Sequence, residues 1–479
     1  MYSFLSKKFH QTDSNDAPNL VSSFTGSDPL VDFDDNINDC SQYHHQSRVT
    51  LHEFEEKNLV MEASISAITW FQGNIQTAAR NVRCRLKEII KLNPWLLGRL
   101  VRNTEDRSRP LQLVYDEGLY DPAEYEIDEL FIFHSIHDVE RSYTFSIDMS
   151  LQETTRLANE YDFTVKPAKS LIDQDEPIFK IAIVPDSSRP NQFALITSLS
   201  HRVGDGFTFY SLYKMLDPQR PVILLNPERK LDVVRQIEES MGKKMLEGIG
   251  GFWVKVLFAK DIIMSKLRGD QWSQKIFLLD DNHIKRVKQN LEASKESGRT
   301  PSTNDIVVSS CFDVSKPDLG LMCINFRGKI NNCNESDAPN YFNTIIYRPR
   351  DYATPALIRE SISGECFERA AKPPTELLKS TPTLMMKKVH VSICTNWATF
   401  NNDDFSLGPS FQQVLHMPLK DMRYASPSLI SNFTVFKPWP GKIAICVAGS
   451  PKMVECFSRA SFVLRNPEVS NVDVASHFV

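Results

Sequence analysis

The stretch "ALITSLSHRVGDGFTFYSLYKML", Ala194–Leu216, passes from an apolar run through a short glycine-containing loop into a helical pattern. The run Phe193–Leu199 predicts a buried strand. The apolar positions after the loop recur at helical spacing: Phe209, Leu212, Tyr213 and Leu216. A strand, a short loop and a helix in this order are a common support for a reactive side chain in the loop.

The loop carries the pattern H-x-x-x-D-G, with His201 four residues before Asp205. Eleven histidines in this chain produce about 0.7 matches to H-x-x-x-D by chance, and "HSIHD" at His134–Asp138 is a second match. The His201 copy differs because Gly204 and Gly206 flank its aspartate, which lets the backbone turn tightly. The pattern alone therefore leaves the role of the histidine open.

Two interpretations of this histidine stand side by side. An imidazole titrates near neutral pH, so His201 is a candidate general base that takes a proton from a hydroxyl or an amine. Alternatively His201 is a packed core residue and Asp205 caps the following helix, a role that aspartate often has. The motifs of a serine elbow, a zinc protease and a phosphate-binding loop are absent from the sequence, so none of them competes for the catalytic role.

Composition limits the classes of function. A chain of 479 residues is longer than one core usually serves, which predicts two domains or lobes. The formal net charge of −5 offers no broad attraction for nucleic acid. The nine cysteines are scattered without any C-x-x-C, which indicates reduced thiols inside a cell. The N-terminal residues lack the apolar region of a secretory signal, so we expect a cytoplasmic protein.

Periodic apolar positions predict further elements in both halves. The spacing predicts an amphipathic helix that begins at Ile75 and stops at Asn93–Pro94, and Pro177–Val184 is expected to pair as a strand with Phe193–Leu199. A helix is expected around 285–294. Strand-like or buried apolar runs follow: Asp305–Val314, Gly320–Ile330, Lys387–Trp397 and Gly441–Ser450. The class is therefore mixed α/β.

The apolar stretch Gly248–Leu267 is interrupted by Lys255, Lys260 and Asp261, so it is not expected to span a bilayer. We expect a half-buried helix in the connection between the lobes. The alternative is a helix that lies on a membrane surface.

Several segments in order resemble the chloramphenicol-acetyltransferase-like superfamily, and within it the BAHD type of CoA-dependent acyltransferase. They are "NPWLLGRL" (Asn93–Leu100), "SLSHRVGDG", "STNDIVVSSCF", "INFRGKI" with "APNYFNTII", and "TNWATFNNDDFSLGPS". The chain departs from the family at two places. Ser406 and Leu407 replace the glycine and tryptophan of D-F-G-W-G, and Asn343 directly follows Phe342 where the family has Y-F-G-N. The resemblance is therefore to a divergent member.

The resemblance implies two similar α/β lobes, each a sheet flanked by helices, with an active-site channel between them. The expected parts are a flexible N-terminal arm at 1–50, an N-terminal lobe at 51–216, a crossover segment at 217–298 and a C-terminal lobe at 299–479. The implied reaction moves an acyl group from acyl-CoA, a co-substrate, to a small-molecule alcohol or amine by direct transfer. Neither a metal nor a permanently bound cofactor is implied.

The resemblance also assigns roles to residues. His201 is the general base, Asp205 pairs with Arg327 and holds the loop, and Gly206 leaves room at the channel wall. Thr395, in "TNW", is a weaker candidate to donate a hydrogen bond to the oxyanion, with an ordinary strand threonine as the alternative. Asp404 and Phe405 are expected to support the lobe.

Other functions remain open from the sequence. Condensation with an acyl carrier protein or wax-ester-type transfer would use the same fold, although those enzymes usually carry two adjacent histidines where this chain has Ser200–His201. A binding or scaffold protein on a retired acyltransferase fold is a further alternative, favoured by the eroded D-F-G-W-G match. The expected partners are small molecules, with no nucleic acid, and the expected state is a monomer.

Overall fold

The computed structural model describes residues 46–102, 111–117, 127–135, 145–241, 252–294, 300–363, 389–400, 405–422 and 426–464. The chain divides into two compact units, Met1–Tyr43 and His44–Val479, and every described residue belongs to the second unit. Within the range expected as an N-terminal arm, only 46–50 are described, and they form strand β1.

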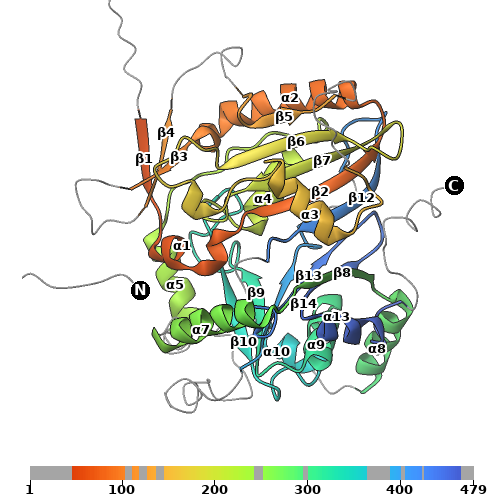
Figure 1. Cartoon of the computed structure of the whole chain (residues 1–479). Helices are drawn as coiled ribbons and strands as arrows, with labels where there is room; N and C mark the ends of the chain where they lie inside the picture. The colour runs from red at the N-terminus through yellow and green to blue at the C-terminus, as the bar shows by residue number, and fades with distance from the viewer. Residues whose placement is uncertain are drawn as a thin grey trace, which may run out of the picture. The chain divides into compact units, whose positions relative to one another are not determined.

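Three sheets make up the described unit (Figure 1). A five-stranded sheet has the order β12 (Gln412–Leu419), β2 (Ile65–Gln72), β7 (Gln192–Leu199), β6 (Phe179–Pro185) and β5 (Phe131–Phe133). A six-stranded sheet has the order β10 (Phe342–Tyr347), β9 (Leu319–Asn325), β11 (Val391–Asn396), β13 (Ile430–Phe436), β14 (Ala444–Gly449) and β8 (Ser273–Leu278). A small sheet joins β1 (Gln46–Thr50), β4 (Gln112–Asp116) and β3 (Arg99–Val101).

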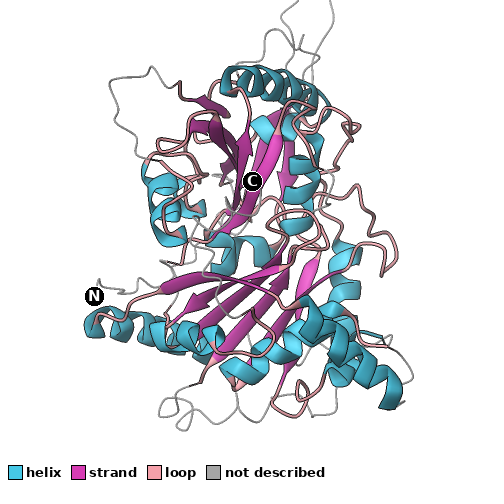
Figure 2. Cartoon of the chain, turned by 90° about the vertical axis from the view of Figure 1, so that its right-hand side faces the viewer, coloured by secondary structure: helices cyan, strands magenta, loops and turns pink. Residues whose placement is uncertain are grey.

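Helices flank both large sheets (Figure 2). Around the five-stranded sheet, α2 (Ile75–Leu92) packs on β6, α3 (Leu151–Glu160) on β12 and α4 (Gly206–Met215) on β7. Around the six-stranded sheet, α13 (Pro451–Ser458) packs on β8 and β14, and α9 (Thr303–Ser315) on β11. The remaining helices are α1 (Glu53–Lys57), α5 (Leu231–Met241), α7 (Phe252–Arg268), α8 (Asp281–Ser294) and α10 (Pro355–Ser363).

Local sequence patterns explain the elements that were expected. The five apolar positions predicted for one face of α2 are all buried: Ile75, Ala79, Val82, Leu86 and Ile89. Helix α2 ends where Asn93 caps it and Pro94 begins a 3-10 turn. The predicted strand pair is the antiparallel β6–β7 hairpin. The apolar run Asp305–Val314 is largely buried, but it is a helix rather than a strand, because Ser302 and Asp305 form a capping box at the start of α9.

The sequence did not predict that strand β12 would join the five-stranded sheet. It pairs antiparallel with β2, although about 340 residues separate the two strands (Figure 1). The imidazole of His416 on β12 hydrogen-bonds with β2 and α4: Nδ1 lies 2.9 Å from Thr69 Oγ1, and Nε2 lies 2.9 Å from Tyr210 Oη. His416 is fully buried, and burial lowers its pKa to about 3. The imidazole is therefore neutral and both of its nitrogens are satisfied.

Strand β8 lies inside the range expected as a crossover, yet it is an edge strand of the six-stranded sheet. Its neighbour α7 carries the apolar stretch that was singled out in the sequence. Ile263 and Leu267 on this helix are exposed, whereas Ser265 is buried. No helix of the described residues is both long enough and apolar enough to cross a membrane.

Candidate active site

The loop between β7 and α4 carries His201 and is held in a tight conformation. A Cβ added at Gly204 would lie 2.9 Å from Cγ2 of Thr208, which is closer than real Cβ atoms approach. At Gly206 the nearest atom, Nε1 of Trp397, would lie 3.5 Å away, which is ordinary contact. The close approach within the loop that requires glycine is therefore at Gly204.

The carboxylate of Asp205 has two structural tasks. Its Oδ1 accepts hydrogen bonds from the backbone N–H groups of Phe207 and Thr208, each at 3.1 Å, and thereby caps helix α4. Its Oδ2 accepts from the guanidinium of Arg327 at 2.8 Å and from the backbone N–H of Tyr341 at 3.1 Å. The capping role and the expected pairing with Arg327 are thus both present, and neither excludes the other.

The side chain of Arg327 joins α4 to the segment that follows β9. The guanidinium is fully buried and donates to the carbonyl oxygens of Asp337 at 2.9 Å and Pro339 at 2.6 Å. It also lies 4.7 Å from the ring centroid of Phe207. These contacts place the segment 337–341 directly beside the His201 loop.

Asn340 in this segment contacts His201 twice. Its Oδ1 lies 3.1 Å from the imidazole Nδ1, and its Nδ2 donates to the His201 carbonyl oxygen at 2.9 Å. An amide oxygen only accepts, so Nδ1 carries the proton in this arrangement. The lone pair of Nε2 is then the basic site of the imidazole.

Glu55 from helix α1 sets the orientation of the Asn340 amide. One carboxylate oxygen of Glu55 accepts from Nδ2 of Asn340 at 2.8 Å and from its backbone N–H at 3.2 Å. Because a carboxylate attracts the amide N–H₂ group and repels the amide oxygen, the oxygen is turned toward His201. Burial raises the pKa of Glu55, but Arg229, 3.1 Å away, and the other donors lower it by more, so its carboxylate is ionised.

The surroundings of His201 favour the neutral form of its imidazole. Burial lowers the pKa of His201, and the positive charge of Lys420 lowers it further. Asp205 and the hydrogen bonds of the imidazole act in the opposite direction, but the pKa stays below its ordinary value. His201 is therefore ready to accept a proton at neutral pH.

The other site residues expected from the sequence are Thr395, Phe405 and Asp404. Thr395 is half-buried on β11, and its hydroxyl lowers the pKa of the Cys323 thiol on β9. Phe405 is buried and stacks on Tyr213 with ring centroids 4.2 Å apart, as expected of a residue that supports the lobe. Asp404 lies outside the described residues.

Sequence reasoning missed Asn340, Glu55 and Lys420. Asn340 stood inside the matched segment "APNYFNTII", but the comparison with Y-F-G-N drew attention to Asn343 instead. Glu55 is one of three glutamates in "HEFEEK" and carries no local signal. Within the described ranges no group of three or more His, Cys, Asp and Glu side chains is arranged to hold a metal ion.

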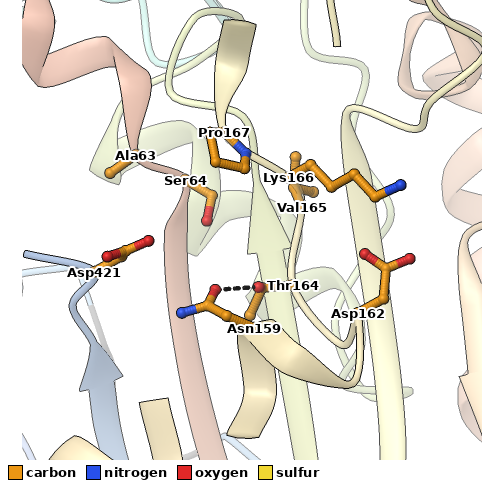
Figure 3. Close-up of a pocket in the computed structure, with 9 residues that line it drawn as sticks. All are labelled: Ala63, Ser64, Asn159, Asp162, Thr164, Val165, Lys166, Pro167 and Asp421. Atoms are coloured by element: carbon orange, nitrogen blue, oxygen red, sulfur yellow. Dashed lines mark hydrogen bonds between the residues drawn. The ribbon is translucent and has the colours of Figure 1, made fainter. Parts of the chain in front are cut away.

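A small pocket has no residue of the His201 loop in its lining (Figure 3). Its volume is about 50 Å³, and it is lined by Ala63, Ser64, Asn159, Asp162, Thr164, Val165, Lys166, Pro167 and Asp421. A pocket for a substrate usually measures about 300–1,000 Å³, so this one has room for little more than water.

Known proteins were compared with the chain at the levels of sequence and structure. No family model matches the sequence, and no curated protein sequence matches it. Solved structures do match. TRI101 of F. graminearum, crystallised with coenzyme A and T-2 mycotoxin, has a TM-score of 0.57 at 12% identity, over 87% of this chain and 98% of its own.

Two further structures belong to different kinds of enzyme. The trichothecene 15-O-acetyltransferase TRI3 of Fusarium sporotrichioides has a TM-score of 0.52 at 9% identity, over 90% of this chain and 94% of its own. The first condensation domain of the calcium-dependent antibiotic synthetase has a TM-score of 0.53 at 12% identity, over 90% of this chain and 96% of its own. The chain has the chloramphenicol-acetyltransferase-like fold.

The chloramphenicol-acetyltransferase-like fold accounts for the two large sheets with their flanking helices, which confirms the fold class expected from the sequence. At identities of 9 to 12%, the similarity establishes the fold and leaves the reaction to be argued from the residues of this chain. An acetyltransferase and a condensation domain share this fold, so the fold does not distinguish an acyl-CoA donor from a carrier-protein donor.

Proposed function

We propose that this protein transfers an acyl group from an acyl-CoA to a hydroxyl or amine of a small-molecule acceptor, with His201 as the general base. The observation that carries the proposal is the contact between His201 Nδ1 and Asn340 Oδ1 at 3.1 Å, which leaves Nε2 as the basic nitrogen. Neighbours of the same fold that were crystallised with coenzyme A support the choice of donor.

The proposed reaction is a direct transfer. The acceptor oxygen or nitrogen attacks the thioester carbonyl carbon while His201 Nε2 takes the acceptor's proton. The tetrahedral intermediate then collapses, the carbon–sulfur bond breaks, and the imidazolium returns the proton to the departing CoA thiolate. Every proton is accounted for by one imidazole, and no acyl-enzyme forms.

In this scheme Thr395 is the candidate that stabilises the oxyanion of the intermediate. Asp205 and Arg327 act on the loop that holds His201, rather than on the substrate. The proposal includes a cytoplasmic location and a monomeric enzyme, as expected from the sequence.

The experiment that tests the function combines donor and acceptor screens. Purified protein is incubated with a panel of radiolabelled acyl-CoAs and a cell extract, and labelled products are identified by mass spectrometry. We expect a labelled small molecule with the parent protein and loss of labelling by about 10²-fold or more in His201→Ala. Undiminished labelling in that folded variant would refute the general-base role.

Two further arms separate the alternatives. Labelling from an acyl-pantetheinyl carrier protein, with none from free acyl-CoA, would identify a condensation-type enzyme. Absence of coenzyme A and acetyl-CoA binding at millimolar concentration in a calorimetric titration, together with no labelling, would favour a scaffold protein.

A further inference from the structure

Lys420 is a cation that the proposed reaction does not use. It directly follows β12, and Gln274 Nε2 donates to its carbonyl oxygen at 3.0 Å, which fixes its backbone. The half-buried side chain runs over the indole of Trp397, with the ammonium 4.7 Å from the ring centroid. That indole lies against Gly206 at the start of α4. The cation therefore points toward the end of the His201 loop.

The charge of the ammonium also acts on the imidazole. It lowers the pKa of His201 and that of the Cys323 thiol on β9. Asn325, two residues farther along β9, pairs with Phe342, and the Phe342 ring lies 5.6 Å from the His201 ring. The paired ends of β9 and β10 thus lie beside the His201 ring.

Among the described residues, four other cations with buried side chains each pair with a carboxylate. These pairs are Lys180–Asp162, Arg202–Glu62, Arg229–Glu55 and Arg327–Asp205. For Lys420, in contrast, no carboxylate of the described residues lies within 4.0 Å. Its thiol neighbours supply no charge, because burial raises the pKa of both Cys323 and Cys446 to about 12. Burial in turn lowers the pKa of Lys420, because it disfavours the charged ammonium.

We propose that Lys420 binds a carboxylate that one of the two substrates carries close to the reacting carbonyl. This inference rests on the proposed acyl transfer, since it takes the His201 imidazole as the reaction centre. The phosphates of CoA are separated from the thioester by the whole pantetheine arm, so a cation beside His201 meets either the acyl group or the acceptor. A carboxylate there would pair with an ammonium that has no carboxylate within 4.0 Å among the described residues, and the indole of Trp397 holds the cation in place.

The carboxylate has two sources, which separate experiments distinguish. For the donor, calorimetry compares the affinity for malonyl-CoA and succinyl-CoA with that for acetyl-CoA. For the acceptor, acetyl transfer from acetyl-CoA is measured to 4-hydroxybenzoate and to its methyl ester. Each is run with the parent, Lys420→Met, Lys420→Arg and the control Lys452→Met, which changes an exposed lysine on α13.

We expect the parent to prefer the anionic partner in one of the two experiments by roughly 10- to 100-fold. Lys420→Met should lose this preference, Lys420→Arg should keep most of it, and the control should match the parent. A parent without preference in both experiments, or a preference that survives in Lys420→Met, overturns the inference. Acetyl-CoA binding then tells the two proposals apart, because it persists when only the carboxylate inference fails and is absent when the acyltransferase proposal itself fails.

Discussion

Asn340 Oδ1 lies 3.1 Å from His201 Nδ1, although the two residues stand 139 positions apart in the chain. Glu55, which stands 285 positions before Asn340 in the chain, accepts a hydrogen bond from the Nδ2 of the same amide. The protonation pattern of the imidazole is thus set by two residues outside its own loop. We expect the rate of proton transfer to fall when the imidazole loses this orientation, even if the histidine itself is kept.

Replacement of Asn340 by alanine should lower kcat by roughly 10- to 100-fold with little change in KM, because the imidazole loses its orientation while the substrates keep their contacts. Steady-state kinetics with the product found in the labelling experiment measure both constants. Asn331→Ala, at an exposed position, is the matched control. An unchanged kcat in Asn340→Ala would contradict the positioning role.

The pH dependence of kcat/KM should show a midpoint on its acidic side below 6.5. The active form is the neutral imidazole, and burial lowers the pKa of His201, so activity falls only as the pH drops through that lowered value. Lys420→Met should move the midpoint upward, because the nearby positive charge that helps to lower the pKa is removed. A midpoint above 6.5 in the parent would be inconsistent with the buried imidazole.

Asp205→Asn and Arg327→Met should each destabilise the protein by about 3–5 kcal/mol, because each leaves a buried charge without its partner. Chemical denaturation followed by fluorescence measures the loss. The double variant should be destabilised by less than the sum of the two single changes, since both remove the same ion pair. Single variants that unfold at the parent's denaturant concentration would show that the pair contributes nothing.

His416 should make the protein less stable in acid. Its pKa is about 3 when folded and about 6.5 when unfolded, so between these values the unfolded chain binds the extra proton. The stabilisation is complete above pH 6.5 and is lost as the pH falls toward 3, by about 2 kcal/mol between pH 6.5 and 5. In His416→Gln this part of the pH dependence should disappear. Denaturation curves of both proteins at pH 7 and 5 give the comparison, and equal losses would argue against a neutral buried imidazole.

Thr395→Val should reduce kcat by about 10²- to 10³-fold if its hydroxyl stabilises the oxyanion, whereas Thr395→Ser should retain most of the activity. Single-turnover kinetics isolate the chemical step. An active valine variant would leave Thr395 as an ordinary residue of strand β11.

The sequence by itself determined the elements whose stabilising contacts are local. Helix α2 follows from the spacing of its apolar face, and Asn93–Pro94 ends it. The β6–β7 hairpin follows from two apolar runs with a turn between them, and α4 begins where Asp205 caps it. Spacing and capping act within a few residues, so they can be read directly from the chain.

Only the tertiary structure decided which distant segments meet. Strand β12 pairs with β2 at the edge of the five-stranded sheet, and His416 on β12 hydrogen-bonds with Thr69 and Tyr210. The local pattern of 412–419 predicts neither the pairing nor these hydrogen bonds. Periodicity shows that a residue is buried without showing its partner. For the same reason the sequence indicated His201 as a candidate base, whereas the Asn340 contact that prepares its Nε2 required the folded chain.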